Sequence, residues 1–117
     1  MRQKGYLGEE IAAKFMVQKG YFVISRNFTI QGGEIDLIVK KDGILVFVEV
    51  KAFWGDYFGP PEQAVTNRKK RILLRAIYTY MKSYPERFID WRCDLVSIEF
   101  ISTKKAKIKH FHNIFLR

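Results

Sequence analysis

The sequence has few of the residues that form cross-links, thiolate metal sites or membrane spans. Cys93 is the single cysteine among 117 residues, so an internal disulfide is excluded and a small buried residue is expected there. The sequence contains no uninterrupted apolar run of the roughly eighteen residues that a membrane helix needs. The N-terminal stretch MRQKGYLGEEIAAK also lacks the apolar segment of a signal peptide. These absences predict a soluble cytoplasmic protein that has no membrane partner.

Acidic residues are scarce relative to basic ones. The chain has 21 lysines and arginines against 12 aspartates and glutamates, which gives a formal net charge of +9. Such an excess attracts polyanions over long distances, and nucleic acid is the commonest of these. A merely well-solvated surface would account equally well for the charge alone. Because 48% of the residues are hydrophobic, a folded domain is expected.

Residue periodicity predicts a single α/β domain with a mixed sheet flanked by helices. The ranges expected to be regular are, in order, a helix at 6–19, a strand at 21–28, two strands within 34–51, a helix at 62–84, and strands at 92–101 and 107–115. A loop is expected at 52–61, where AFWGDYFGPP carries two glycines and two prolines. The sequence has no repeat or linker, so residues 1–117 are expected to form one domain of order α-β-β-β-α-β-β.

The dipeptide Asp42-Gly43 lies between two apolar runs and is typical of a two-residue type I′ hairpin. If these residues form the turn, the opposed pairs are Lys41 with Ile44, Val39 with Val46, Leu37 with Val48, Asp36 with Glu49, and Glu34 with Lys51. Because side chains alternate along a strand, the four charged residues at the far end then share one face. The other face is fully apolar and is expected to be buried: Ile35, Leu37, Val39, Ile44, Val46, Val48 and Val50.

The opposed acids Asp36 and Glu49 need a neutralising partner, since like charges at this spacing destabilise a sheet. A divalent cation is one solution. Carboxylates, a backbone carbonyl and water form the all-oxygen ligand set that Mg²⁺ or Mn²⁺ prefers, whereas zinc would favour histidine or cysteine. The other solution is a solvated acidic patch that Lys51 neutralises alone, and the residue types leave both open. His110 and His112 share a predicted strand face without a third ligand, so we expect them to be solvated.

An aspartate followed across a hairpin by Glu-x-Lys resembles the motif of the PD-(D/E)XK nucleases. More of the chain is similar to one family, because GEEIAAKF, GYFVISRNF, GGEIDLI, VFVEVK, FGPPEQAVTNRK and RCDLV follow in order the motifs of the YraN-like family. That family is little characterised and is regarded as a distant relative of archaeal Holliday-junction resolvases. The resemblance covers nearly the whole chain, to about residue 98, and implies a restriction-endonuclease-like fold.

The resemblance also implies a role for each matching residue. Asp36 and Glu49 would be metal ligands, and Lys51 would be the catalytic lysine that orients the attacking water and stabilises charge on the phosphate. Glu9 would be the additional acid that related resolvases bring to the site, both catalytic and metal-binding. An acid early in a helix is also a common partner of the helix dipole, so this simpler role stays open. Phe53 departs from the pattern, since the family usually has arginine at that position.

Basic residues early in the second predicted helix are expected to contact the phosphates of a nucleic acid, unless they form only a solvated helix face. Trp54 follows the catalytic lysine in an aromatic loop at 53–58 and could stack on an exposed base or pack on the sheet. Glu34 belongs to the family motif, and Lys69 matches its helical lysine. The predicted nucleic-acid-binding residues are Glu34, Trp54, Arg68, Lys69, Lys70 and Arg71.

The function expected from these residues is metal-dependent endonucleolytic hydrolysis of phosphodiester bonds, with Mg²⁺ or Mn²⁺ as cofactor. DNA is favoured over RNA as the partner. The predicted elements leave no separate domain for sequence recognition, so selectivity for shape, as in branched DNA, is expected. A homodimer would present two sites for paired cuts. The alternative is a non-catalytic nucleic-acid-binding or assembly protein that keeps the nuclease fold.

Overall fold

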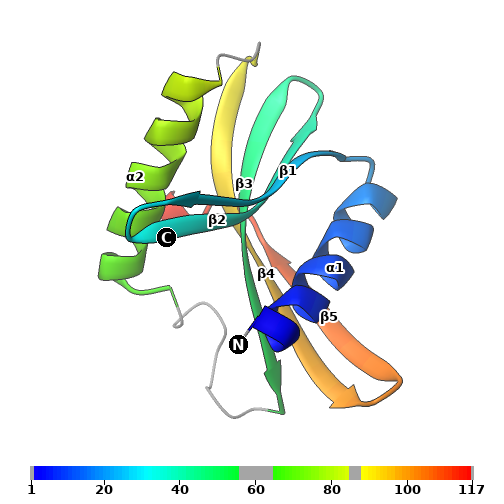
Figure 1. The fold of residues 1–117 in the computed structure, drawn as a ribbon. Coiled ribbons are helices and arrows are strands. Elements are labelled where there is room, and N and C mark those ends of the chain that lie inside the picture. Colours follow the sequence, from blue (N-terminus) through cyan, green and yellow to red (C-terminus); the bar gives the residue numbers. More distant parts are fainter. Residues whose placement is uncertain (1, 56–64, 85–87, 117) are drawn as a thin grey trace.

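The structure, a computed structural model, describes residues 2–55, 65–84 and 88–116. Its elements are α1 (Arg2–Gln18), β1 (Phe22–Ile30), β2 (Gly33–Lys41), β3 (Ile44–Trp54), α2 (Asn67–Ser83), β4 (Asp90–Ser102), β5 (Lys105–Phe111) and the short 3-10 helix η2 (Ile114–Leu116). The five strands form one sheet in chain order (Figure 1), with β3 and β4 parallel and the other neighbours antiparallel. The predicted mixed α/β fold and its element order are confirmed.

The sheet separates two apolar cores, each covered by one helix (Figure 1). On one face Met16 of α1 packs with Leu37 and Val46, and on the other face Leu73 of α2 packs with Phe47. The central strands β2 and β3 are buried on both faces, which explains their nearly continuous apolar sequences. No helix in the described ranges has both the length and the apolarity needed to cross a membrane.

Cys93 lies in the core beneath α2 and is fully buried, as predicted. Burial raises the pKa of its thiol, with neighbouring carboxylates acting in the same direction, so the thiol stays protonated and unreactive. The residue therefore serves packing.

Helix α2 begins where Thr66 caps it. The Thr66 hydroxyl accepts a hydrogen bond from the amide of Lys69 at 3.1 Å, which satisfies one of the free amides of the first turn. The helix thus starts later than the predicted 62, and residues 62–64 lie outside the described ranges. Its buried stripe consists of Leu73, Ala76, Ile77 and Tyr80. Burial of each large aliphatic side chain stabilises the fold by roughly 1.5–3 kcal/mol, so packing holds the helix despite its basic exposed face.

Two strand ends differ from prediction by more than two residues. The strand β3 continues to Trp54, so the first part of the predicted loop 52–61 is strand, and residues 56–61 lie outside the described ranges. At the C-terminus the predicted strand 107–115 ends at Phe111. Asn113 has a φ of 55°, a left-handed conformation outside the extended region of regular strands, and the chain then turns into η2.

The hairpin between β2 and β3 has the predicted turn and, near the turn, the predicted register. Asp42 and Gly43 both have positive φ, as a type I′ turn requires. The pairs Lys41/Ile44, Val39/Val46 and Leu37/Val48 are confirmed.

At the far end of the hairpin the expected pairing is wrong. Backbone pairing stops at Leu37/Val48, and the expected pairs Asp36/Glu49 and Glu34/Lys51 do not form. Ile35 also lies in the core beneath α2, whereas the expected apolar face of Leu37 packs under α1. The two strands therefore separate at the end that carries the charged residues.

Candidate metal and nucleic-acid site

The predicted catalytic residues gather where β2 separates from β3. There Oδ2 of Asp36 accepts a hydrogen bond from the amide of Val50 at 2.8 Å. The carboxylate thus binds an amide of β3 at the point where β2 no longer pairs with that strand. Asp36 is held in the gap between the strands, with 8% of its surface exposed.

Two further acids lie beside Asp36. Carboxylate oxygens of Glu9, Glu34 and Asp36 are all within 4.8 Å of one another. Glu9 is 7% exposed and lies beyond the first turn of α1, so it is not a first-turn partner of the helix dipole. A Cβ at Gly8 would lie 2.8 Å from the Cβ of Ala52, and only glycine lets α1 approach β3 this closely. Gly8 is thus the part of the GEE motif that positions Glu9, a role that the sequence reasoning missed.

Glu49 faces α2, and its side chain is 13% exposed. Nζ of Lys69 lies 3.2 Å from Oε2 of Glu49. Lys51 is half-buried on the same face of β3, because the intervening Val50 packs against the core beneath α1. The structure does not support a solvated acidic patch neutralised by Lys51 alone, since the acids are buried and a lysine of α2 forms an ion pair with Glu49.

The electrostatics of this group favour a bound cation. Burial raises the pKa of Asp36 to about 9, and the charge of Glu49 acts in the same direction. Burial also raises the pKa of Glu49, although Lys69 opposes this effect. At neutral pH the carboxylates therefore retain a proton that a divalent cation would displace. The donors are all oxygens, which fits Mg²⁺ or Mn²⁺.

A pocket of about 470 Å³ opens onto the carboxylates. It is lined by Thr29, Ile30, Gly32, Gly33, Glu34, Asp36, Lys69 and Ile72. A Cβ at Gly33 would meet Cγ2 of Ile72 at 2.7 Å, so the Gly32-Gly33 turn lets β2 start close against α2. The pocket gives a ligand access to Asp36 from the side of Lys69.

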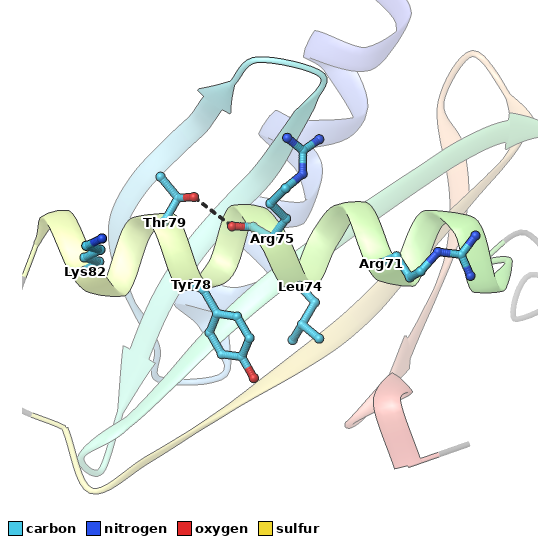
Figure 2. Close-up of a pocket in the computed structure, with 6 residues that line it drawn as sticks. All are labelled: Arg71, Leu74, Arg75, Tyr78, Thr79 and Lys82. Atoms are coloured by element: carbon cyan, nitrogen blue, oxygen red, sulfur yellow. Dashed lines mark hydrogen bonds between the residues drawn. The ribbon is translucent and has the colours of Figure 1, made fainter.

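The basic residues of α2 divide into two groups. Lys69 points to the carboxylates, whereas Arg68 and Arg71 are exposed and Lys70 is half-buried. Farther along the helix, a groove of about 440 Å³ is lined by Arg71, Leu74, Arg75, Tyr78, Thr79 and Lys82. Figure 2 shows Arg75 and Thr79 on one side of the helix, opposite Leu74 and Tyr78. The basic surface therefore extends beyond the predicted run.

Trp54 does not lie beside Glu49. Its ring packs against Phe100 with centroids 5.4 Å apart, and both line a groove of about 430 Å³ together with Leu7 and Ile11 of α1. This groove is on the α1 side of the sheet, whereas Glu49 faces α2. Trp54 is 51% exposed and available for contacts, but on the other face of the sheet. The aromatic residues at 57 and 58 lie outside the described ranges.

The prediction of a solvated strand histidine is wrong for His110. Its side chain is 4% exposed, and Nε2 lies 2.8 Å from Oδ2 of the fully buried Asp94. Nζ of Lys19, which can only donate, lies 2.7 Å from Nδ1 of His110. The histidine therefore accepts from Lys19 and donates to Asp94. His112 is exposed, as expected.

Asp94 is the centre of this second cluster. Its Oδ1 accepts hydrogen bonds from Nε of Arg92 at 3.0 Å and from the amide of Asn113 at 2.8 Å. Burial alone would raise the pKa of Asp94, but hydrogen bonds from His110 and Arg92 lower it overall. Asp94, His110 and His112 have ligand atoms within 4.8 Å of one another. Because protein donors already neutralise the carboxylate, we interpret the cluster as structural.

The comparisons with known proteins agree with the YraN-like motifs. Residues 8–98 match the model of the uncharacterised protein family UPF0102. A UPF0102 protein of Syntrophomonas wolfei is 45% identical over 114 residues, covering 97% of this chain and 98% of the relative. The protein STH1475 of Symbiobacterium thermophilum is 42% identical and covers 97% of each chain. A UPF0102 protein of Clostridium perfringens is 35% identical, over 95% of this chain and 92% of the relative. The chain therefore belongs to the UPF0102 family.

Proposed function

We propose that this protein is a metal-dependent endonuclease that hydrolyses phosphodiester bonds in nucleic acid. The observation that supports this most is the convergence of buried acids from three elements. Carboxylate oxygens of Glu9 of α1 and Asp36 of β2 lie within 4.8 Å of each other, and the charge of Glu49 of β3 raises the pKa of Asp36. A buried acidic group costs folding free energy unless it binds something positive, which is typical of a functional site.

Each residue has a role in this proposal. Asp36 and Glu49 would hold Mg²⁺ or Mn²⁺, with Glu9 as a further ligand and Glu34 beside them. A divalent metal held there would supply positive charge to the phosphoryl oxygens and activate water for attack. Lys51, on the same face as Glu49, orients the attacking water and stabilises charge on the phosphate.

The substrate is proposed to be DNA of branched shape, through the resemblance to junction resolvases. The basic surface of α2 contacts phosphates, which bind every sequence equally. Two copies of the chain in a homodimer would supply paired sites for the two strands of a junction. Residues 1–117 act as one nuclease domain in this proposal.

Cleavage of a panel of DNAs tests the activity directly. Junction, flap, single-stranded and linear duplex DNA, with a matching RNA, are incubated with Mg²⁺ or Mn²⁺. We expect the branched DNAs to be cut and Asp36→Asn and Glu9→Gln to abolish cutting. Glu10→Gln is the matched control, because Glu10 is next to Glu9 but pairs with Arg26 outside the site at 2.6 Å. This variant should cut like the wild type.

Two results would contradict the proposal. Equal cutting by Asp36→Asn would show that a contaminant is responsible. Binding of DNA without cutting by folded, metal-loaded protein would favour the non-catalytic nucleic-acid-binding protein. Light scattering tests the homodimer, and a strict monomer would exclude paired sites.

A further inference from the structure

The edge strand β5 carries a row of exposed lysines that the predicted basic surface did not include. Lys105, Lys107 and Lys109 alternate with Ala106, Ile108 and His110 along the strand. Ile108 packs against the core beneath α1, and the His110 ring contacts Phe15 of α1. Because side chains alternate, the three lysines project from the opposite face of the sheet. That is the face on which Glu49 meets Lys69.

The register of the sheet aligns these lysines with the candidate site. Lys51 in β3 is paired with Ser97 in β4, and Ser97 is paired with Lys109 in β5. With about 4.8 Å between strands, the Cα atoms of Lys51 and Lys109 are roughly 10 Å apart. One row farther along, Phe53, Glu99 and Lys107 are aligned in the same way. Lys51 and Lys109 therefore lie two strands apart in the same row, whereas Lys107 lies opposite the acid Glu99 of β4.

The position of α2 leaves this row beside the helix and not beneath it. Helix α2 packs mainly against β1 and β2, at the other end of the sheet. The carboxylates thus lie between the basic helix on one side and the β5 lysines on the other. Within β5 no acidic residue accompanies the lysines, and Glu99 of β4 is the acid paired with this row, opposite Lys107.

We propose that Lys105, Lys107 and Lys109 form a second phosphate-binding surface, so that a nucleic-acid strand crosses the sheet from α2 past Lys51 to β5. This inference rests on the proposed function, because it assumes that nucleic acid is the ligand of the carboxylate site. It adds the direction in which the ligand lies: across the strands, on the face shared by Glu49 and Lys51.

A structural role for the same lysines predicts a different result. Lysine on an edge strand commonly prevents pairing with a second copy of the chain, and β5 is an edge strand. In that role the lysines would maintain solubility and would not change the affinity for nucleic acid. Salt dependence separates the two roles, because phosphate contacts release counterions.

Binding is measured by fluorescence anisotropy with labelled duplex and junction DNA in EDTA, over a series of salt concentrations. The variants are Lys107→Gln, Lys109→Gln and the double variant. Each lost phosphate contact should reduce the slope of log affinity against log salt by roughly 0.9, and the double variant should lose roughly twice that. Lys14→Gln is the control, because Lys14 is exposed on α1 and the charge change is the same. Its slope should equal that of the wild type.

An unchanged slope in the double variant would overturn the proposal, and aggregation seen by light scattering would then assign the lysines to edge protection. Absence of DNA binding by the wild type would overturn it as well. A different result would contradict the endonuclease proposal. If the salt dependence of the lysine variants falls as expected but the wild type never cuts with Mg²⁺ or Mn²⁺, the phosphate-binding surface is supported and the endonuclease activity is not. Circular dichroism confirms that each variant is folded.

Discussion

Asp36 and Asp94 are two buried aspartates of one sheet whose surroundings have opposite charge. Asp94 accepts hydrogen bonds from protein donors, including Arg92, and its pKa is lowered. Asp36 lies beside Glu9 and Glu49, and its pKa is raised to about 9. The protein itself neutralises one carboxylate, whereas the other is neutral only with a proton or a cation. Burial is therefore common to both, and the sign of the neighbouring charges distinguishes the structural residue from the candidate ligand.

Removing the charge of Asp94 is expected to have the largest effect. Asp94→Asn would leave the Arg92 guanidinium and the His110 ring without their anionic partner in a buried place. Breaking such a pair typically costs about 3 kcal/mol or more. We expect a loss of this size in the free energy of unfolding, measured by urea titration.

The same substitution at Asp36 should not reduce the free energy of unfolding. Asp36→Asn removes a carboxyl group whose ionisation burial and the charges of Glu49 and Glu9 oppose, and the new amide oxygen can still accept from Val50. Without metal, we expect unfolding free energy equal to or above that of the wild type. An equal loss of stability in both variants would show that the two aspartates do not differ in kind.

The next largest expected difference between Asp36 and Asp94 is in how each affects stability as the pH changes. The pKa of Asp36 is raised in the folded state from about 4, so its contribution is fully present below that pH and is lost as pH rises towards 9. Metal-free wild type should therefore lose stability between about pH 5 and 9, and Asp36→Asn should lose less. The pKa of Asp94 is lowered, so its contribution is present above about pH 4 and is lost as pH falls below that.

Thermal unfolding over this pH range, with and without Mn²⁺, checks both signs. Bound Mn²⁺ replaces the proton on the carboxylates and should reverse the loss at high pH. A wild type whose stability rises steadily from pH 5 to 9 without metal would contradict the raised pKa of Asp36.

Gly8→Ala should affect the acidic site through geometry. The new Cβ would lie 2.8 Å from that of Ala52, so α1 must move away from β3 and take Glu9 with it. We expect roughly a tenfold loss of Mn²⁺ affinity by calorimetry and a cost of about 1–2 kcal/mol in stability. Ala52→Gly removes the opposing methyl group, so the double variant should recover most of the affinity. Failure of this rescue would mean that the contact does not position Glu9.

The sequence predicted the parts of the fold that depend on local pattern. The Asp42-Gly43 turn and the adjoining apolar pairs are set by backbone preference and alternation, and both are observed. The separation of β2 from β3 depends on the hydrogen bond from the Val50 amide to the Asp36 side chain. The alternation of apolar and polar residues gives no indication of this bond. The predicted register therefore failed at the charged end of the hairpin, where the candidate site lies.

Contacts between residues that are far apart in the chain could not be predicted from the sequence either. His110 is 16 residues from Asp94 and 91 from Lys19, so no local spacing indicated that these groups would meet. The Arg-x-Asp pattern of Arg92 and Asp94 was present, but its meaning depends on Asn113 turning back to the carboxylate. The pairing of β5 with β4 likewise brings the β5 lysines to the side of the sheet that carries the site. The basic pattern of the second helix gave no indication of these lysines.

The smallest expected effect concerns Lys69, which forms an ion pair with Glu49 of the acidic site. Lys69 is 39% exposed, so its interaction with Glu49 is partly screened by water and is worth well under the 3 kcal/mol expected at Asp94. It nevertheless occupies the Glu49 oxygen that a metal would use. Lys69→Gln should therefore increase Mn²⁺ affinity by roughly twofold to fivefold, by removing a competing charge.

Calorimetric titration of Lys69→Gln, with Arg68→Gln as the neighbouring control of equal charge change, measures this difference. Arg68 is exposed on α2, so its variant should bind Mn²⁺ nearly as the wild type does. If both variants gain affinity equally, the effect is only that of net charge. If Lys69→Gln loses affinity, the lysine supports the metal site by positioning Glu49. A gain at Lys69 alone would show that the protein partly neutralises this site too, through a lysine side chain that is more exposed to water than the Arg92 and His110 side chains beside Asp94.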